Sequence, residues 1–204
     1  MTEVLDLKKT HKSLYSAPVP TPVIVDVPRM SFLMADGMGD PNASPEFAAA
    51  IEALYGVAYT LKFTFKRAPR PLDFVVMPLE GLWWADDMSA FIKGDRTRWK
   101  WTLMIMQPDY VTAKDVMEAK ALMHDKKPEV PLDLVRLEAF HEGKAAQIMH
   151  IGPFSAEGPN IERVHAFITA SGGKLRGKHH EIYLSDMRRT APEKLKTIIR
   201  QPMD

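Results

Sequence analysis

The sequence predicts an α+β fold made of two strand-helix-strand-strand units, and three observations lead to it. Two amphipathic segments, 45–66 and 159–171, have the apolar period of surface helices. Each is preceded by one strand-like segment and followed by two, so the two halves share one element order. Each helix should bury its apolar stripe against an antiparallel sheet and leave the other sheet face free. Two such units side by side would enclose a cleft between their free faces.

The elements of the first half follow from capping and proline signals. Residues 1–20 are expected to form a polar arm, and the strand after it should be interrupted at Pro28. Ser44 is a predicted N-cap with Pro45 at the first helical position, and Pro69 stops the long helix. The strands predicted for this half are 30–35, 73–85 and 98–106.

The second half follows a linker, KPEVP, that ends at Pro131. Before the linker, Thr112 and Asp115 are spaced to open a helix with a capping box. After it, two strands should form a hairpin with a tight turn at Glu142-Gly143. The strands assigned to the second repeat are 145–151, 178–185 and 195–201. The predicted boundaries are 1–20 for the arm and 21–204 for one domain, with pseudo-repeats at about 21–127 and 132–203.

Composition excludes several classes of function. The 204 residues carry a formal net charge of +1, which gives no electrostatic reason to expect nucleic acid or an anionic membrane as partner. No apolar run has membrane-spanning length, and the N-terminus lacks a signal-peptide core. With no cysteine and no histidines at metal-ligand spacing, we expect no metal and no cofactor. The expected location is cytoplasmic.

The segment HEIYL contains a carboxylate, Glu181, where a buried strand normally carries an apolar residue. Burying an unpaired charge is costly, so such a residue is paired, protonated or directed into a cleft. Strand alternation places Glu181 and Tyr183 on the free face and Ile182 on the helix-packed face. The competing explanation is a solvated charge on a plain surface. A desolvated carboxylate has a raised pKa and is able to deprotonate a water molecule, which makes Glu181 the first candidate functional residue.

Aromatic residues of the first half are a second group of candidates. Trp84 lies at the end of one predicted strand, Trp101 lies in the next, and Tyr55 lies just off the apolar stripe of the long helix. Large rings with a polar tip suit a flat aromatic ligand. Core packing is the competing explanation for each of them.

Three stretches of the chain resemble the GyrI-like small-molecule-binding family, in its stand-alone type. They are GKHHEIYLSDMRRTAPEKLKTIIRQPM, AAQIMHIGPFSAEGPNIERVHAFI, and FVVMPLEGLWWA together with RWKWTLMIMQP. The resemblance covers about residues 20–203 and implies duplicated strand-helix-strand-strand (SHS2) units around a ligand cleft. Glu181 matches the cleft glutamate of that family. Met187 stands where the family pattern has proline.

The resemblance also implies a function. In multidrug-sensing relatives the cleft glutamate binds cationic or aromatic drugs. Some stand-alone members hydrolyse cyclopropane-bearing, DNA-alkylating compounds, and in these the cleft glutamate is similar to a catalytic residue. Glu181 and Tyr55 are accordingly the predicted catalytic residues of a hydrolase, and its partner is an aromatic or cationic small molecule. The predicted ligand-binding residues are Trp84, Trp101, Tyr183, Met104 and Met106.

Three other functions stay open beside hydrolysis. The first is a binder that sequesters lipophilic or cationic drugs without chemistry. The second is a protein that restrains DNA gyrase, against which the near-neutral charge argues, because a DNA mimic needs an acidic surface. The third is a tetrapyrrole-binding protein, which would need His150 or His165 as axial ligand.

Overall fold

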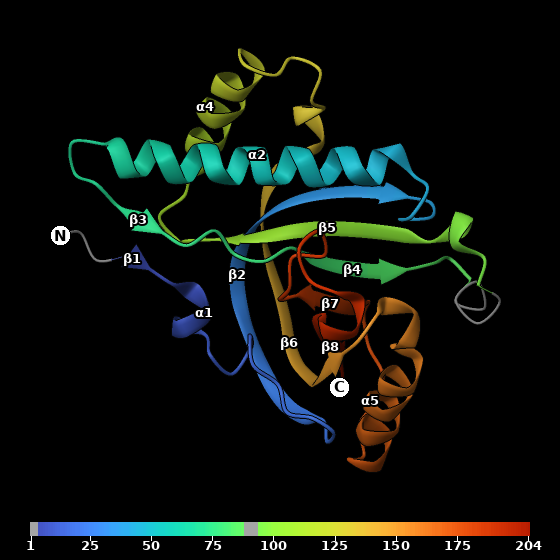
Figure 1. The fold of residues 1–204 in the computed structure, drawn as a ribbon. Coiled ribbons are helices and arrows are strands. Elements are labelled where there is room, and N and C mark those ends of the chain that lie inside the picture. Colours follow the sequence, from blue (N-terminus) through green and yellow to red (C-terminus); the bar gives the residue numbers. More distant parts are fainter. Residues whose placement is uncertain (1–3, 88–93) are drawn as a thin grey trace. The chain divides into compact units, whose positions relative to one another are not determined.

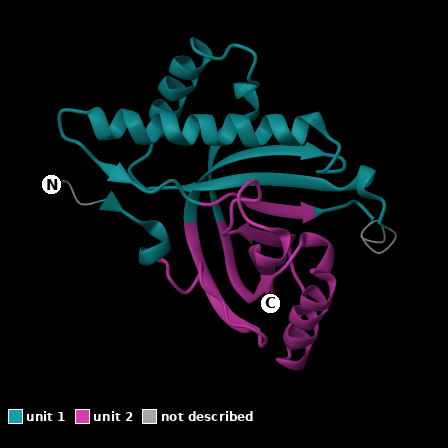
Figure 2. Cartoon of the chain, viewed as in Figure 1, with its two compact units in different colours: residues 1–10, 30–77, 84–140 teal, residues 11–29, 78–83, 141–204 magenta. Residues whose placement is uncertain are grey.

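The structure is a computed structural model that describes residues 4–87 and 94–204. The described chain divides into two compact units, coloured separately in Figure 2. Unit 1 comprises the described residues of 1–10, 30–77 and 84–140, and unit 2 comprises 11–29, 78–83 and 141–204. The units interleave along the chain because three strands contribute residues to both. These strands are β2 (Val23–Met38), β4 (Glu80–Trp84) and β6 (Arg136–Ile151).

Unit 1 is built on the antiparallel pair of β2 with β5 (Lys100–Gln107), in a register that places Ala35 opposite Leu103. Helix α2 (Pro45–Arg67) runs along this pair and packs on β5 (Figure 1). A shorter helix, α4 (Ala113–His124), packs on α2. The core of the unit is formed by fully buried side chains that include Phe32, Leu54, Leu61, Trp101, Leu103 and Ile105.

Helices α2 and α4 begin as the sequence predicts. Ser44 caps α2 by accepting a hydrogen bond from the backbone N–H of Phe47, and Pro45 occupies the first helical position. Thr112 and Asp115 form the predicted capping box of α4. The smaller elements of this unit are β1 (Val4–Leu5), α1 (Leu7–Thr10), β3 (Asp73–Phe74) and 3-10 turns at Arg96–Arg98 and Leu132–Leu134, with β1 and β3 paired in parallel.

Two breaks predicted within strands are wrong. Strand β2 continues through Pro28. The proline lies outside the β2–β5 ladder, which begins at Ser31, so its missing N–H removes no hydrogen bond from that ladder. The hairpin turn at Glu142-Gly143 is also absent, since β6 passes through both residues as one strand of 16 residues. Glu142 is buried by its contacts with His180, so a charge expected in an exposed turn lies inside unit 2.

Unit 2 contains an antiparallel sheet with the strand order β4-β7-β8-β6, where β7 is His179–Tyr183 and β8 is Lys196–Pro202. Helix α5 (Gly158–Ala170) packs on one face of this sheet (Figure 1). Val164 of the helix and Ile199 of β8 belong to one buried apolar cluster. Short 3-10 turns at Phe154–Ala156 and Pro192–Lys194 complete the unit.

The opposite face of this sheet is covered by residues 11–16, which belong to the predicted N-terminal arm. Gln147 Nε2 donates a hydrogen bond to the carbonyl oxygen of Ser13 at 2.8 Å, and Arg200 Nη2 donates to that of Leu14 at 2.6 Å. Gln147 and Arg200 lie directly opposite each other in the β6–β8 ladder, so both project from the same face. Both faces of the sheet in unit 2 are therefore covered.

The predicted α+β fold class is confirmed, with antiparallel strand pairs and helices packed on one face of the strands within each unit. The two helices predicted for the repeats arise within a few residues of their predicted bounds. The predicted strand 73–85 is instead two strands, β3 and β4, and β3 pairs in parallel with β1. Among the described residues, no helix has both the length and the hydropathy that crossing a bilayer requires.

Candidate functional site

Glu181 lies on the face of the sheet that packs against α5. It stands directly opposite Ile199 in the β7–β8 ladder, and opposed residues of an antiparallel pair share one face. Ile199 belongs to the apolar cluster beneath α5. Glu181 and Tyr183 therefore face the helix and Ile182 the other side, which is the reverse of the prediction. Both faces of this sheet are covered, one by α5 and the other by residues 11–16. An apolar residue such as Ile182 is therefore buried on either face and does not show which face the helix covers.

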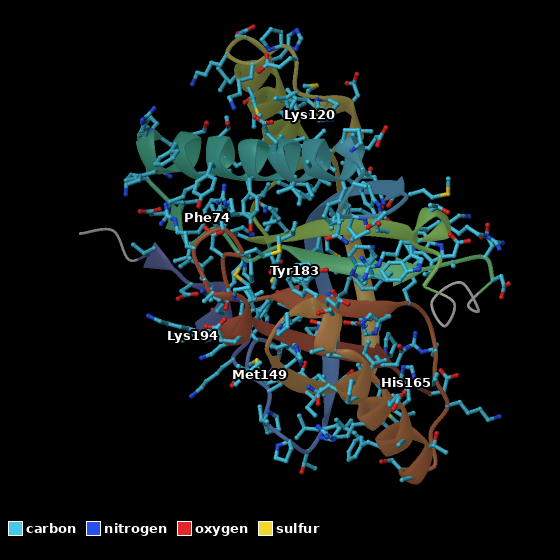
Figure 3. All side chains as sticks on the ribbon, turned by 45° about the vertical axis from the view of Figure 1, so that its right-hand side comes forward. Phe74, Lys120, Met149, His165, Tyr183 and Lys194 are labelled. Atoms are coloured by element: carbon cyan, nitrogen blue, oxygen red, sulfur yellow. The ribbon has the colours of Figure 1, made fainter. Side chains whose placement is uncertain are left out.

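Both carboxylate oxygens of Glu181 have hydrogen-bond partners. Tyr183, labelled in Figure 3, donates its hydroxyl proton to Oε2 at 2.7 Å, and His179 Nε2 lies 3.1 Å from Oε1. Trp83 Nε1, on β4, donates in turn to the hydroxyl oxygen of Tyr183 at 3.0 Å. The Glu181 carboxylate is held in place by this chain, yet its side chain keeps 15% of its surface exposed.

The two groups at the centre of this chain differ in charge at neutral pH. Burial acts to raise the pKa of Glu181, but the hydrogen bonds from His179 and Tyr183 outweigh it, and the net shift of the pKa is downward. The raised pKa expected from the sequence is therefore wrong for this residue. Burial and the neighbouring charge of Glu181 raise the pKa of Tyr183 well above its ordinary value. Glu181 is an ionised acceptor, and Tyr183 is a neutral donor.

A second carboxyl group adjoins the first. Glu157, immediately before α5, is only 4% exposed. Burial, and then the charge of Glu181, raise the pKa of Glu157 to about 9. Glu157 therefore carries a proton at neutral pH, and a neutral neighbour does not oppose the ionised form of Glu181, whose own pKa is lowered. One acid and one base lie side by side, as expected for two carboxyl groups that cannot both ionise in a dry site.

Aromatic side chains line the Glu181 site. The ring of Phe154 meets that of Tyr183 edge-on, with centroids 5.6 Å apart. A Cβ atom at Gly81 would lie 2.8 Å from Trp83 Nε1 and 3.0 Å from the Tyr183 hydroxyl, so glycine leaves room for the hydrogen bond between them. The predicted site did not include Trp83, His179 or Glu157, although strand alternation places His179 on the same face as Glu181. The only signal for Trp83 is its position two residues from Gly81 on the same strand face.

A separate charged network fills the opposite face of β7. His180 Nε2 lies 3.0 Å from Glu80 and its Nδ1 lies 3.0 Å from Glu142, while Arg200 Nη1 donates to Glu142 at 3.1 Å. Burial disfavours the charged forms, but the attraction between opposite charges outweighs it. The pKa of His180 is raised to about 9 and that of Glu142 is lowered to about 2. Each of these side chains is 1% exposed. The network is charge-balanced and enclosed, which fits a structural role.

The predicted ligand-binding residues of the first half belong to unit 1. Trp101 and Met104 are completely buried, Met106 is 2% exposed, and Trp84 is partly buried. The ring of Phe47 meets Trp101 edge-on at 5.1 Å between centroids. These contacts place the residues in well-packed surroundings. Their role as walls of a ligand cleft stays a prediction.

Tyr55 lies on α2 beside α4, in an open groove of about 340 Å³. Its ring stacks on that of Tyr59, with centroids 6.3 Å apart. An ion pair of 2.6 Å between Lys127 and Glu52 crosses the groove. The lining residues are Glu52, Tyr55, Gly56, Tyr59, Thr60, Met123, Lys126 and Lys127. Tyr55 belongs to unit 1, and its catalytic role stays a prediction.

Two observations on the described residues bear on metal binding and on tetrapyrrole binding. Over residues 4–87 and 94–204, no three His, Asp or Glu side chains are grouped so as to hold a metal ion. Both ring nitrogens of His150 are engaged, Nε2 with the carbonyl oxygen of Pro153 at 3.1 Å and Nδ1 with the Asn160 amide at 3.0 Å. His150 is therefore held as a structural residue, which leaves His165 as the remaining predicted axial ligand.

Residues 20–203 match the family model described as the GyrI-like small molecule binding domain. Three solved structures from Listeria innocua are similar over nearly the whole chain. An uncharacterized conserved protein is 43% identical with a TM-score of 0.91, covering 98% of this chain and 100% of that one. Two proteins described as hydrolases are 42% and 40% identical, with TM-scores of 0.86 and 0.88, covering 98% and 99% of this chain and all of theirs. No curated protein matches the sequence.

Proposed function

Because the chain belongs to the GyrI-like small-molecule-binding family, we propose that it hydrolyses cyclopropane-bearing, DNA-alkylating electrophiles by adding water. The observation that carries this proposal is the Glu181 carboxylate, ionised, fixed by His179 and Tyr183, and still partly exposed. An anion fixed in this way is suited to accept a proton from water. The two similar Listeria innocua proteins described as hydrolases support a hydrolytic reaction for this chain.

The reaction proceeds on a cyclopropane conjugated with a dienone. Water attacks an unsubstituted ring carbon and forms a C–O bond, while the strained C–C bond breaks and its electron pair passes to the carbonyl oxygen. Glu181 takes the proton that the water releases, and the resulting phenolate takes up one proton, so the product equals substrate plus water. Tyr55 is the proposed donor to the carbonyl oxygen, where negative charge develops. Trp84, Trp101, Met104 and Met106 remain the proposed apolar walls.

The test uses a cyclopropane spiro-fused to cyclohexadienone at the carbon para to the carbonyl, which water converts into para-(hydroxyethyl)phenol. Loss of the dienone absorbance is followed with the parent, Glu181→Gln and Glu193→Gln, an exposed glutamate of the same unit. We expect turnover by the parent, a loss of about a hundredfold or more in kcat for Glu181→Gln, and no change for Glu193→Gln. A parent rate equal to that of buffer, or equal rates for the two variants, would contradict the proposal.

Tyr55 is tested by its own variant. Removing its hydroxyl in Tyr55→Phe should lower kcat by about a hundredfold if it stabilises the developing oxyanion. Tyr59→Phe is the matched control, because Tyr59 stacks on Tyr55 in the same groove. Equal activity of the two variants would remove Tyr55 from the mechanism and leave the role of Glu181 unaffected.

Binding without chemistry is the second candidate function, and the geometry of Glu181 gives it one specific support. A fixed anion beside Tyr183 and Trp83 offers a flat cation both charge and ring faces. Quenching of tryptophan fluorescence by a flat cationic dye, weakened in Glu181→Gln and unaccompanied by turnover of the dienone, would favour this function over hydrolysis.

A further inference from the structure

Helix α2 carries three aromatic rings at successive turns, Tyr55, Tyr59 and Phe63, which together form an aromatic stripe. Tyr55 and Tyr59 stack with their ring centroids 6.3 Å apart, and Tyr59 and Phe63 stack with theirs 6.4 Å apart. Arg67 extends the row, since its Cζ lies 5.7 Å from the centroid of the Phe63 ring. The aromatic stripe is therefore one continuous row of side chains along unit 1.

The aromatic stripe lies on the side of α2 that faces away from the core. Tyr59 is two residues from Val57 and two from Leu61, both of which are buried, and two residues correspond to about 200° of rotation around an α-helix. Tyr59 is 47% exposed and Phe63 is 43% exposed. Single exposed apolar side chains are ordinary, but a row of stacked rings is a contiguous apolar surface, and such surfaces mark interfaces.

The charges of α2 are divided between its two halves. Its acidic residues, Glu46 and Glu52, lie in the first half, and its basic residues, Lys62, Lys66 and Arg67, lie in the second half. Two copies of α2 in antiparallel contact therefore place the acidic half of each against the basic half of the other, whereas parallel copies would oppose like charges. Charge complementarity of this kind selects a partner and fixes its register. The surface of α2 is thus complementary to itself.

We propose that the aromatic stripe is the contact surface for a second copy of this chain, with the two α2 helices antiparallel about a twofold axis at Tyr59. A twofold interface joins the same surface of both copies. Glu52 and Lys66 lie seven residues before and after Tyr59, about two helical turns on either side. The axis therefore places Glu52 of each copy beside Lys66 of the other. Phe63 of the second copy lies beside Tyr55 and forms an outer wall of the groove between α2 and α4.

Glu52 and Lys66 are free to turn toward a second copy, because neither leaves a buried charge behind. Their side chains are 51% and 53% exposed. Glu52 is paired with Lys127 at 2.6 Å, and a carboxylate accepts hydrogen bonds from more than one donor. Asp73 is paired with Lys66 at 2.9 Å and keeps its shorter ion pair with Lys62, at 2.6 Å, when Lys66 turns outward.

Sedimentation velocity over a range of protein concentrations tests the association without any substrate, so its outcome is separate from that of the hydrolysis test. We expect the parent to pass from one chain to two as its concentration rises. Glu52→Lys brings lysines together and Lys66→Glu brings glutamates together, so each variant should weaken association about tenfold or more. The double variant restores opposite charges and should associate within about threefold of the parent. Met117→Lys, at a residue of α4 that is 64% exposed, is the control and should change nothing.

Disulfide crosslinking tests the position of the axis. The chain contains no cysteine, so one introduced cysteine forms a disulfide only with the same residue of another copy. A residue at a twofold axis meets itself, so Tyr59→Cys should link two chains under mild oxidation and Met117→Cys should not. A parent that stays a single chain at every concentration overturns the proposal. A double charge variant as weak as the single variants, or equal crosslinking by the two cysteine variants, also overturns it.

Discussion

Both carboxylate oxygens of Glu142 lie within 3.1 Å of His180 Nδ1, although 38 positions of sequence separate the two residues. The second ring nitrogen of His180 meets Glu80 at 3.0 Å. Because a carboxylate only accepts hydrogen bonds, an imidazole between two of them donates from both nitrogens and is therefore the charged imidazolium. This cation lies inside unit 2, where solvent does not screen it.

The raised pKa of His180 makes the protein less stable at alkaline pH. A group whose folded pKa lies above its unfolded value stabilises fully below the unfolded pKa, and that contribution is lost as pH rises through the folded pKa. For His180 the window runs from 6.5 to about 9. At about 1.4 kcal/mol per pKa unit, the loss is roughly 3 kcal/mol. Urea unfolding at several pH values measures it. His180→Gln should lack this loss and exposed His124→Gln should keep it; stability that rises from pH 7 to 9 would contradict the assignment.

Arg200 is the second cation of this network, and its removal should be severe. Arg200→Met leaves Glu142 with His180 as its remaining charged partner and frees the carbonyl oxygen of Leu14. Breaking a buried pair by removing one partner costs about 3–5 kcal/mol, because a charge stays buried without full compensation. Urea unfolding at neutral pH measures the change. Arg188→Met, at a side chain 87% exposed, should stay within about 0.5 kcal/mol of the parent.

Glu157 produces a different pH dependence of stability. Its folded pKa of about 9 lies above the ordinary value of 4.5, so its stabilising contribution is complete below pH 4.5 and is lost as pH rises toward 9. Glu157→Gln carries no ionisable group there, so its stability should fall less than that of the parent between pH 4.5 and 6.5. In this window His180 is still fully protonated in the folded protein. Parallel curves for the parent and Glu157→Gln would show that Glu157 titrates normally.

The sequence predicted the parts of the fold that depend on neighbouring residues. Ser44 and Thr112 begin helices because a cap satisfies backbone N–H groups two or three residues away, a local requirement. The prediction of a turn at Glu142-Gly143 was wrong because the charge of Glu142 is neutralised by His180, which is remote in sequence. Local turn chemistry carries no information about such a partner.

The candidate site was predictable only through its central residue. Glu181 was found because a carboxylate interrupts an apolar strand. The orientation of the Glu181 side chain was predicted wrongly, since alternation divides a strand into two faces without indicating which face a helix covers. Glu157 has no such local signal, because its character arises from burial beside Glu181.

Gly37 is a packing requirement of unit 1, and its replacement by alanine tests it. A Cβ atom there would lie 2.1 Å from Trp101 Cζ2 and 2.2 Å from Cη2, a distance that neither atom tolerates. The indole is completely buried and Phe47 meets it edge-on, so the ring has to push against packed neighbours to give way. Overpacking of this kind costs about 1–3 kcal/mol. We expect Gly37→Ala to lower the free energy of unfolding by that amount and to shift the tryptophan emission.

The matched control for Gly37→Ala is Gly158→Ala, since a Cβ at Gly158 meets nothing within 4 Å. Alanine at such an open position in the first turn of α5 restricts the unfolded chain without a clash, so stability should stay equal or rise by up to about 1 kcal/mol. A Gly37→Ala protein as stable as Gly158→Ala would mean that the Trp101 ring has room to move. Trp101 would then not be a rigidly packed residue, and its proposed role as a wall that adapts to a ligand would gain support.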